Sequence, residues 1–127
     1  MERDMELVLQ GVNILRKLPN EFDYHYKEEN WNRYSKEQQL MIRKWIRFMF
    51  NPKKGIDKTR SSYGLKHLCE ETLGFYVHND AIKKAMLLEN FIAKTGTVNW
   101  NFNISGEVTS KKIKKFKELF KEELEKI

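Results

Sequence analysis

The sequence has one cysteine, two prolines and no long run of apolar residues. With Cys69 alone the chain cannot form an intrachain disulfide, and low cysteine usage is typical of a reducing compartment. No apolar run approaches the roughly 18 residues that a membrane-spanning helix needs. The opening residues, MERDMELV, do not have the pattern of a signal peptide. We therefore expect a cytoplasmic protein with no membrane segment, in which Cys69 is a small core residue.

Sequence motifs typical of enzymes are also missing. The chain contains no GxxxxGK[ST], HExxH, CxxC or GxSxG pattern. Its three histidines do not have the spacing of a metal site. His67 and Cys69 stand two positions apart, so on a helix they face different directions and cannot form a nucleophile–base pair. We expect a non-enzymatic protein without a metal or cofactor.

Positive charge is unevenly distributed along the chain, whose formal net charge is +6. Between Trp31 and His67 there are ten Lys or Arg against two Asp or Glu, an excess of eight. The tail from Lys111 has seven against four, whereas the two other segments carry an acidic excess. A concentrated positive block indicates a polyanionic partner more strongly than a diffuse one does. The alternative is a solvated, lysine-rich face.

The length of 127 residues and the 40% hydrophobic content suit one folded domain, 1–127. Apolar spacing predicts a helix over Asp4–Leu18, ended by Pro19. Ser35 and Gln38 form a capping-box pattern at the start of a second, strongly apolar helix that ends before Pro52. The basic segment 53–60 that follows is expected to be a flexible loop. The acidic, aromatic segment 21–31 has no clear period and is expected to run over the surface, with an aromatic residue such as Trp31 packing inward.

The stretch 61–104 gives the clearest fold prediction. A helix is predicted from a Ser61 or Ser62 cap to Gly74, and a second from an Asn79 cap to Asn90. The segments 91–94 and 98–104, joined through Thr95-Gly96, are typical of a β-hairpin. In its second strand, alternation predicts one apolar and one polar face, the apolar face containing Val98, Trp100, Phe102 and Ile104 and the polar face Asn99, Asn101 and Asn103. This order predicts a winged helix-turn-helix within a mainly helical α+β domain of about five helices and one hairpin.

Part of this stretch resembles a known group of small domains. The segment SSYGLKH, an acidic pair and then GFYVHNDAIKKAM are similar to winged-helix-like domains of bacterial phages and mobile elements that have no assigned role. Those domains carry an S-Y-x-L-K-H helix and a Y-V-x-N turn ahead of an alanine-containing helix. The resemblance covers about Thr59 to Ile104. It implies a phage or mobile-element setting and supplies no functional residue.

A last amphipathic helix is predicted within 105–127, capped by Thr109 or Ser110. Its apolar stripe must pack on the domain or on a partner, and a homodimer through this helix is one alternative. Lysines crowd the first turn, where the helix dipole favours acids instead. A binding role would explain that conflict. The stripe contains Ile113, Phe116, Phe120, Leu124 and Ile127, and the lysines are Lys111, Lys112, Lys114 and Lys115.

The charge pattern leads to a candidate nucleic-acid site. In a winged helix the second helix of the pair enters the major groove and the hairpin tip contacts the flanking backbone. Here these elements supply only Lys83, Lys84 and Lys94, a weak set for reading bases. Phosphate contacts from the basic block should therefore dominate. The predicted nucleic-acid-binding residues are Arg43, Lys44, Arg47, Lys53, Lys54, Lys58, Arg60, Tyr63, Lys66, Lys83, Lys84 and Lys94.

Aromatic side chains offer a second kind of contact. Tyr63, Tyr76 and Trp100 could stack on single-stranded bases. Trp100 alternates with Phe102 and is better assigned to the core, whereas Tyr63 stands beside basic residues and is the better exposed candidate. The asparagine row is either a water-exposed face or a hydrogen-bonding platform.

Two functions from different classes remain open. The first is a non-enzymatic, nucleic-acid-binding protein of a phage or mobile element. The second is a phage-encoded inhibitor, similar to an anti-CRISPR protein, that binds a host nuclease or effector protein through surfaces such as the aromatic segment 21–31. The sequence leaves the strand type and the sequence specificity open.

Overall fold

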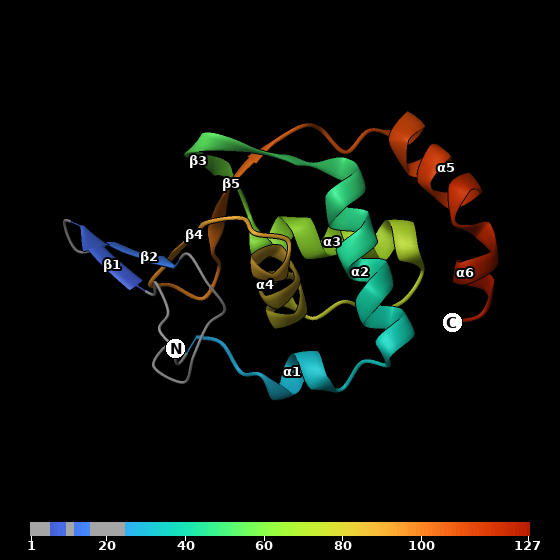
Figure 1. The fold of residues 1–127 in the computed structure, drawn as a ribbon, viewed down its shortest axis with the longest axis horizontal. Coiled ribbons are helices and arrows are strands. Elements are labelled where there is room, and N and C mark those ends of the chain that lie inside the picture. Colours follow the sequence, from blue (N-terminus) through green and yellow to red (C-terminus); the bar gives the residue numbers. More distant parts are fainter. Residues whose placement is uncertain (1–5, 10–11, 16–24) are drawn as a thin grey trace.

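The computed structural model describes residues 6–9, 12–15 and 25–127, and for the first two ranges only the backbone. These residues form six helices and five strands, arranged around a central helical core (Figure 1). In chain order the elements are β1 (Glu6–Leu9), β2 (Val12–Leu15), α1 (Glu29–Asn32), α2 (Lys36–Met49), β3 (Asn51–Ser61), α3 (Ser62–Leu73), α4 (Asn79–Leu88), β4 (Ala93–Thr95), β5 (Asn101–Ser105), α5 (Ser110–Leu119) and α6 (Lys121–Glu125).

The strands form one antiparallel sheet in the order β1-β2-β4-β5-β3. The predicted hairpin is present as β4 and β5, with Ala93 opposite Phe102. Its connection is longer than Thr95-Gly96, because β5 begins only at Asn101. Trp100, Phe102 and Ile104 are fully buried, as the alternation predicts, but Val98 lies in the connection and is 58% exposed. The domain is therefore α+β.

Two predictions of local structure are wrong. Where a helix over Asp4–Leu18 was expected, β1 and β2 pair with each other, and β2 also pairs with β4. Gly11 lies between these strands in the sequence; glycine weakens helices and is favoured in hairpin connections. The expected flexible loop 53–60 belongs to the edge strand β3, which pairs with β5. Its register is irregular: from the pair Pro52–Ile104 to the pair Asp57–Phe102, β3 advances by five residues while β5 advances by two.

The helices of the central stretch agree better with the sequence. Ser35 and Gln38 form the predicted capping box of α2. α3 ends at Gly74, whose φ of 85° lies in the left-handed region that glycine adopts readily. α4 is capped by His78 rather than Asn79, which is the first helical residue. The last predicted helix is two helices, because Phe120 leaves helical geometry between α5 and α6.

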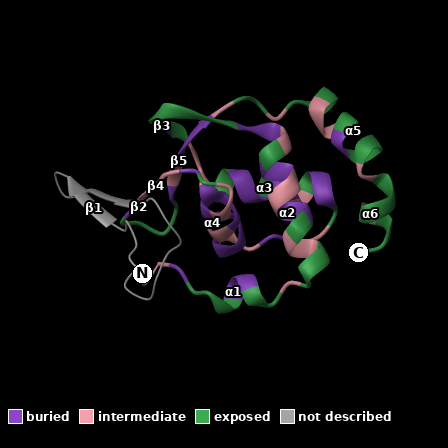
Figure 2. Cartoon of the chain, in the orientation of Figure 1, coloured by how far each residue is buried: buried purple, intermediate pink, exposed green. Residues whose placement is uncertain are grey.

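The core lies between α2, α3, α4 and β5, where Figure 2 shows most of the buried residues. Trp45 of α2 is fully buried, and its indole Nε1 donates to the Thr72 hydroxyl of α3 at 3.0 Å. Trp31 of α1 is also buried, as expected for one aromatic residue of that segment. Cys69 is fully buried, and burial raises the pKa of its thiol, so it is the predicted core residue.

Phe116 fixes the C-terminal helices to the core. It is fully buried and meets the ring of Phe48 of α2 edge to face at 5.4 Å. Ile113, Phe120 and Leu124 pack against the same core. Four of the five residues of the predicted apolar stripe therefore pack on their own domain, whereas Ile127 is 40% exposed. Within the described ranges, no helix has both the length and the apolar character needed to cross a membrane.

Candidate nucleic-acid interface

α4, the helix expected to enter a DNA groove, is almost entirely covered. None of its residues is exposed, and Lys83 is fully buried rather than directed outward as predicted. The Lys83 ammonium donates to the His25 carbonyl at 2.7 Å and lies 3.3 Å from the Asp80 carboxylate. It also lies 4.7 Å from the centre of the Trp100 ring. These contacts hold a buried lysine in the core, where an unpaired charge would be very costly.

The segment around α1 provides this cover. One Asp80 oxygen accepts hydrogen bonds from the Lys27 amide at 3.0 Å and from the Asn30 side chain at 2.8 Å. Lys84, the second predicted groove contact, pairs with Glu28 at 2.7 Å, and its side chain is only 12% exposed. An acidic residue of the chain thus occupies the position at which a phosphate could approach Lys84. In this conformation, α4 cannot enter a groove.

Other predicted cations are paired with carboxylates. Arg43 and Arg47 of α2 both bind Glu89, each at 2.7 Å. Arg47 nevertheless keeps 75% of its side chain exposed, whereas Arg43 keeps 36%. Lys44 is 4.0 Å from Glu123 and lies over the Phe120 ring. These pairs link α2 to the end of α4 and to the C-terminal segment.

Arg60 serves the structure of β3 itself. Its guanidinium binds Asp57 at 2.7 Å and donates to the Gly106 carbonyl. The Thr59 hydroxyl and amide also donate to Asp57, and these bonds, together with Arg60, hold the pKa of this carboxyl well below its ordinary value. Asp57 therefore stays charged and fixes the bend of the strand.

Three lysines on β3 differ from these paired cations. Lys53, Lys54 and Lys58 are exposed, and no carboxylate of the described residues lies within ion-pair distance of them. They stand on an edge strand that Figure 2 shows as mostly exposed. Unpaired surface cations on an edge strand are available to phosphates.

The asparagine row of β5 positions this strand. The Asn103 side chain is buried and donates to the Lys53 carbonyl at 3.0 Å, while its oxygen accepts from the Ile92 amide. The Asn101 side chain donates to the Arg60 carbonyl at 2.7 Å and to the Asp57 carbonyl at 3.3 Å. Both side-chain amides thus hold β5 to the backbone of β3. Asn101 and Asn103 therefore form neither of the two expected features, a water-exposed face or a platform for an external ligand. Asn99, the third asparagine of the row, is exposed, and its side chain accepts a hydrogen bond from Asn79.

Two of the three aromatic candidates are accessible. Tyr63 and Tyr76 are 54% and 60% exposed, whereas Trp100 is fully buried. Lys66 lies between the two tyrosines, 5.9 Å from the Tyr63 ring centre and 4.7 Å from that of Tyr76. Its ammonium binds Glu70 at 2.7 Å, so the predicted Lys66 phosphate contact is largely buried and already paired. Lys94 of β4 is half-buried.

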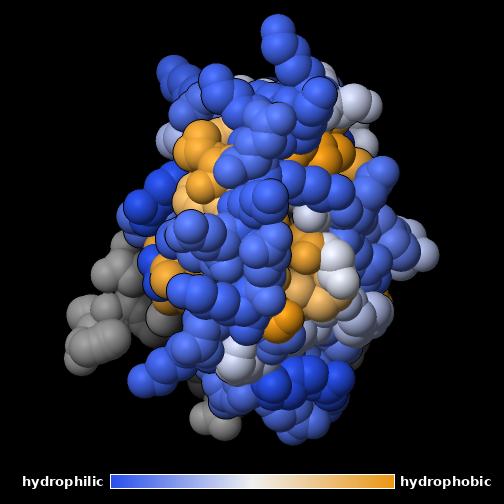
Figure 3. Space-filling model, turned by 90° about the vertical axis from the view of Figure 1, so that its right-hand side faces the viewer, coloured by the Kyte–Doolittle hydropathy of each residue, from blue (hydrophilic) through white to orange (hydrophobic). Residues whose placement is uncertain are grey.

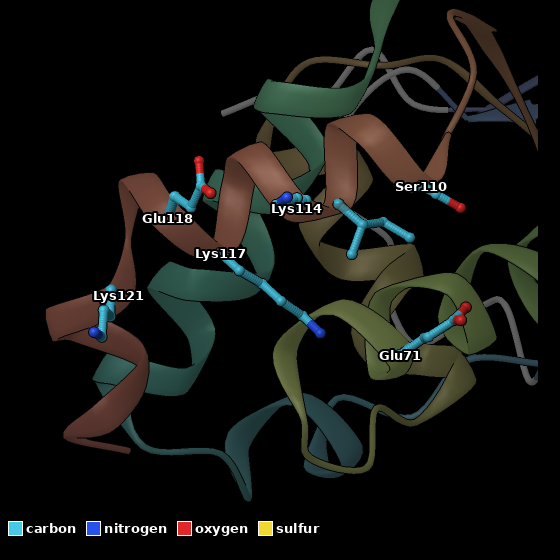
Figure 4. Close-up of a pocket in the computed structure, with 7 residues that line it drawn as sticks. Glu71, Ser110, Lys114, Lys117, Glu118 and Lys121 are labelled. Carbon is cyan, nitrogen blue, oxygen red and sulfur yellow. The ribbon is translucent and has the colours of Figure 1, made fainter.

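One basic surface was not predicted from the sequence. A hollow of about 560 Å³ lies between α3 and α5, with Glu71 on one side and Lys114, Lys117 and Lys121 on the other (Figure 4). Lys114 and Lys117 are three positions apart on α5, which places them on one face of that helix, and Lys121 is the first residue of α6. That spacing could have been recognised in the sequence. Figure 3 faces the side with α5 and α6 and shows a hydrophilic surface with small apolar patches.

The described residues contain no group of three or more histidine, cysteine or acidic side chains that could hold a metal ion. Comparisons with protein-family models, with curated proteins and with solved structures find no match to this chain.

Proposed function

We propose that this protein binds nucleic acid, without catalysis, mainly through phosphate contacts made by the β3 surface, defined as Lys53, Lys54 and Lys58. The observation that carries the proposal is the difference in pairing. Among the cations predicted to contact phosphates, these three are exposed and have no carboxylate of the described residues at ion-pair distance, whereas those on α2, α3 and α4 are paired with carboxylates of the same chain: Arg43, Lys44, Arg47, Lys66, Lys83 and Lys84. Unpaired lysines gain affinity from released counterions when they meet phosphates.

The element order supports a winged-helix assignment for this part of the chain. The order α2-β3-α3-α4-β4-β5 places a helix and a strand ahead of the helix pair and the hairpin. β3 pairs with β5, the second strand of the hairpin, so β3, β4 and β5 are neighbouring strands of the five-stranded sheet. In DNA-binding proteins of the helix-turn-helix class the second helix reads bases. Here that helix is covered, so phosphate contacts with little sequence preference are the mode that fits.

The proposal can be tested by changing Lys53, Lys54 and Lys58 together to alanine. Fluorescence anisotropy with labelled oligonucleotides would give the dissociation constant at several salt concentrations. We expect weaker binding and a shallower salt dependence, by roughly 0.9 in the slope of log K against log salt for each phosphate that the variant no longer neutralises. The matched control changes Lys27, Lys36 and Lys126 to alanine; these lysines are also exposed, and the change in net charge is the same.

Equal losses in the triple variant and its control would show only a general effect of net charge and would overturn the proposal. Binding by the natural chain that disappears at about 150 mM salt would overturn it as well.

That outcome would favour the second candidate, a phage-encoded inhibitor of a host nuclease or effector protein. The observation that favours an inhibitor is a hollow of about 100 Å³ bordered by Leu40 and Ile127, two apolar side chains that are 49% and 40% exposed. Apolar side chains beside charged ones are typical of protein interfaces.

A further inference from the structure

We propose that the preferred ligand is a single strand of nucleic acid, whose bases stack on Tyr63 and Tyr76 while its phosphates meet the β3 surface. This inference rests on the proposed function and names the ligand class for the same region. It depends on the placement of the two rings, on their distance along the chain from the β3 lysines, and on the covered state of α4.

The two tyrosine rings are held in place although they are exposed. Tyr63 lies in the first turn of α3, and its ring meets the His67 ring edge to face at 4.5 Å. Tyr76 lies between α3 and α4, and its carbonyl accepts a hydrogen bond from the Tyr34 hydroxyl at 3.0 Å. The Lys66 ammonium lies near both rings, and Glu70 fixes its position. Glu70 also accepts from the Val77 amide next to Tyr76. One polar network thus positions both aromatic side chains.

The fixed rings reduce the entropy that would be lost when a base stacks on them. Burial raises the pKa of the Glu70 carboxyl, but hydrogen bonds from Lys66 and from the Val77 amide lower it, and the net effect is a lowered pKa. Glu70 is therefore charged. It therefore neutralises Lys66, and the exposed parts of the two tyrosine rings, which Lys66 does not cover, are left as the accessible feature. Flat aromatic faces accept any base, because every base has a π-face.

The rings and the β3 lysines can be reached by the same strand. Tyr63 follows Lys58 by five positions in the chain, so their Cα atoms are at most roughly 17 Å apart. A strand that crosses β3 and continues along α3 would bring successive phosphates to the lysines and its bases to the tyrosines. Because Lys58 and Tyr63 are this close, one continuous strand can contact both residues.

A duplex does not offer the same contacts. Its bases are stacked on one another, so they can reach a protein ring only at ends or after being unstacked. The alternative duplex contact would be a helix in the major groove, and α4 is covered by the segment around α1. The accessible features of this face, two fixed rings near unpaired lysines, are the combination used by proteins that bind single strands.

The test compares one labelled single strand of about 16 nucleotides with the duplex of the same sequence, both measured by fluorescence anisotropy. For Tyr63→Ala and for Tyr76→Ala we expect single-strand affinity to fall roughly 5- to 100-fold and duplex affinity to change less than about twofold. Tyr63→Phe and Tyr76→Phe keep the rings and should remain within about twofold of the natural chain. Leu119→Ala removes a similarly exposed apolar side chain on α5 and is the matched control.

The outcomes separate this inference from the proposed function. Duplex binding that is equal to or tighter than single-strand binding would overturn the preference, as would equal losses for both ligands in the tyrosine variants. If binding depends on the β3 lysines but not on the tyrosines, the proposed function stands and this inference fails. If neither ligand binds in a way that depends on the β3 lysines, the proposed function fails. Because both tyrosines are more than half exposed, urea unfolding should show that the alanine variants remain folded.

Discussion

His78 shows how a single residue can be missed by sequence rules. Its Nδ1 accepts a hydrogen bond from the Asp80 amide at 2.9 Å and so caps α4. The expected cap was Asn79, because asparagine is a common N-cap and histidine is not. The acceptor requires an uncharged imidazole. Burial lowers the pKa of His78 from its ordinary value of 6.5, and nearby cations act in the same direction, although the Asp80 charge opposes them.

We expect the pH dependence of stability to change in His78→Asn. A lowered pKa in the folded state stabilises the fold at pH values above the ordinary 6.5 and loses that effect as the pH falls through the folded-state value. Asparagine also caps helices but does not titrate. Urea unfolding at pH 7.5 and at pH 5 should therefore show a smaller loss of stability on acidification in the variant. Equal losses in both proteins would contradict the role of His78.

At the scale of helices and strands, an element was predicted correctly where its sequence pattern acts over a few neighbouring residues. The capping box of α2, the glycine at the end of α3 and the apolar alternation around Trp100 all act over a few residues, and each was recognised. β3 could not be recognised in this way, because it forms by pairing with β5, whose partner residues are at least 40 positions away in the chain. The short α1 was missed for the same reason: its side chains bind α4 rather than one another.

The contact between α1 and α4 gives a prediction about two adjacent lysines. Lys83→Met removes the buried cation that pairs with the Asp80 carboxylate and donates to the His25 carbonyl, so we expect a loss of about 3–5 kcal/mol in the free energy of unfolding. Lys84→Met breaks a pair whose partner, Glu28, is half exposed and can be solvated, so about 1 kcal/mol or less is expected.

Urea unfolding followed by circular dichroism measures both losses under the same conditions. The two substitutions are chemically identical and lie one position apart on one helix, so each is the control for the other. Similar losses in the two variants would show that the buried position of Lys83 has no special energetic role.

For the whole molecule, burial is concentrated in the central helices and decreases toward the C-terminus. Seven of the ten residues of α4 are buried, whereas α6 has no buried residue. The C-terminal helices are attached mainly through Phe116. The free energy of local opening should follow this gradient.

Hydrogen exchange followed by mass spectrometry should therefore show the slowest amide exchange in α4, which opens only when the whole protein unfolds. Exchange in α6 should be much faster, because that helix can open without disturbing the core. Faster exchange in α4 than in α6 would mean that the segment around α1 opens readily in solution. The groove-reading face of α4 would then be accessible, contrary to the structure described above.

The sequence by itself determined the main helices, the hairpin, the core role of Cys69 and Trp100, and the concentration of positive charge before His67. These follow from periodicity, capping and composition, which act within a few residues of one another. Only the tertiary structure decided which cations are available. Lys83 and Lys53 are both lysines flanked by another lysine, yet one is paired in the core and the other is exposed on an edge strand. The two lysines differ in exposure because different segments, distant in the chain, pack against them. Exposure therefore depends on tertiary packing and not on the local sequence.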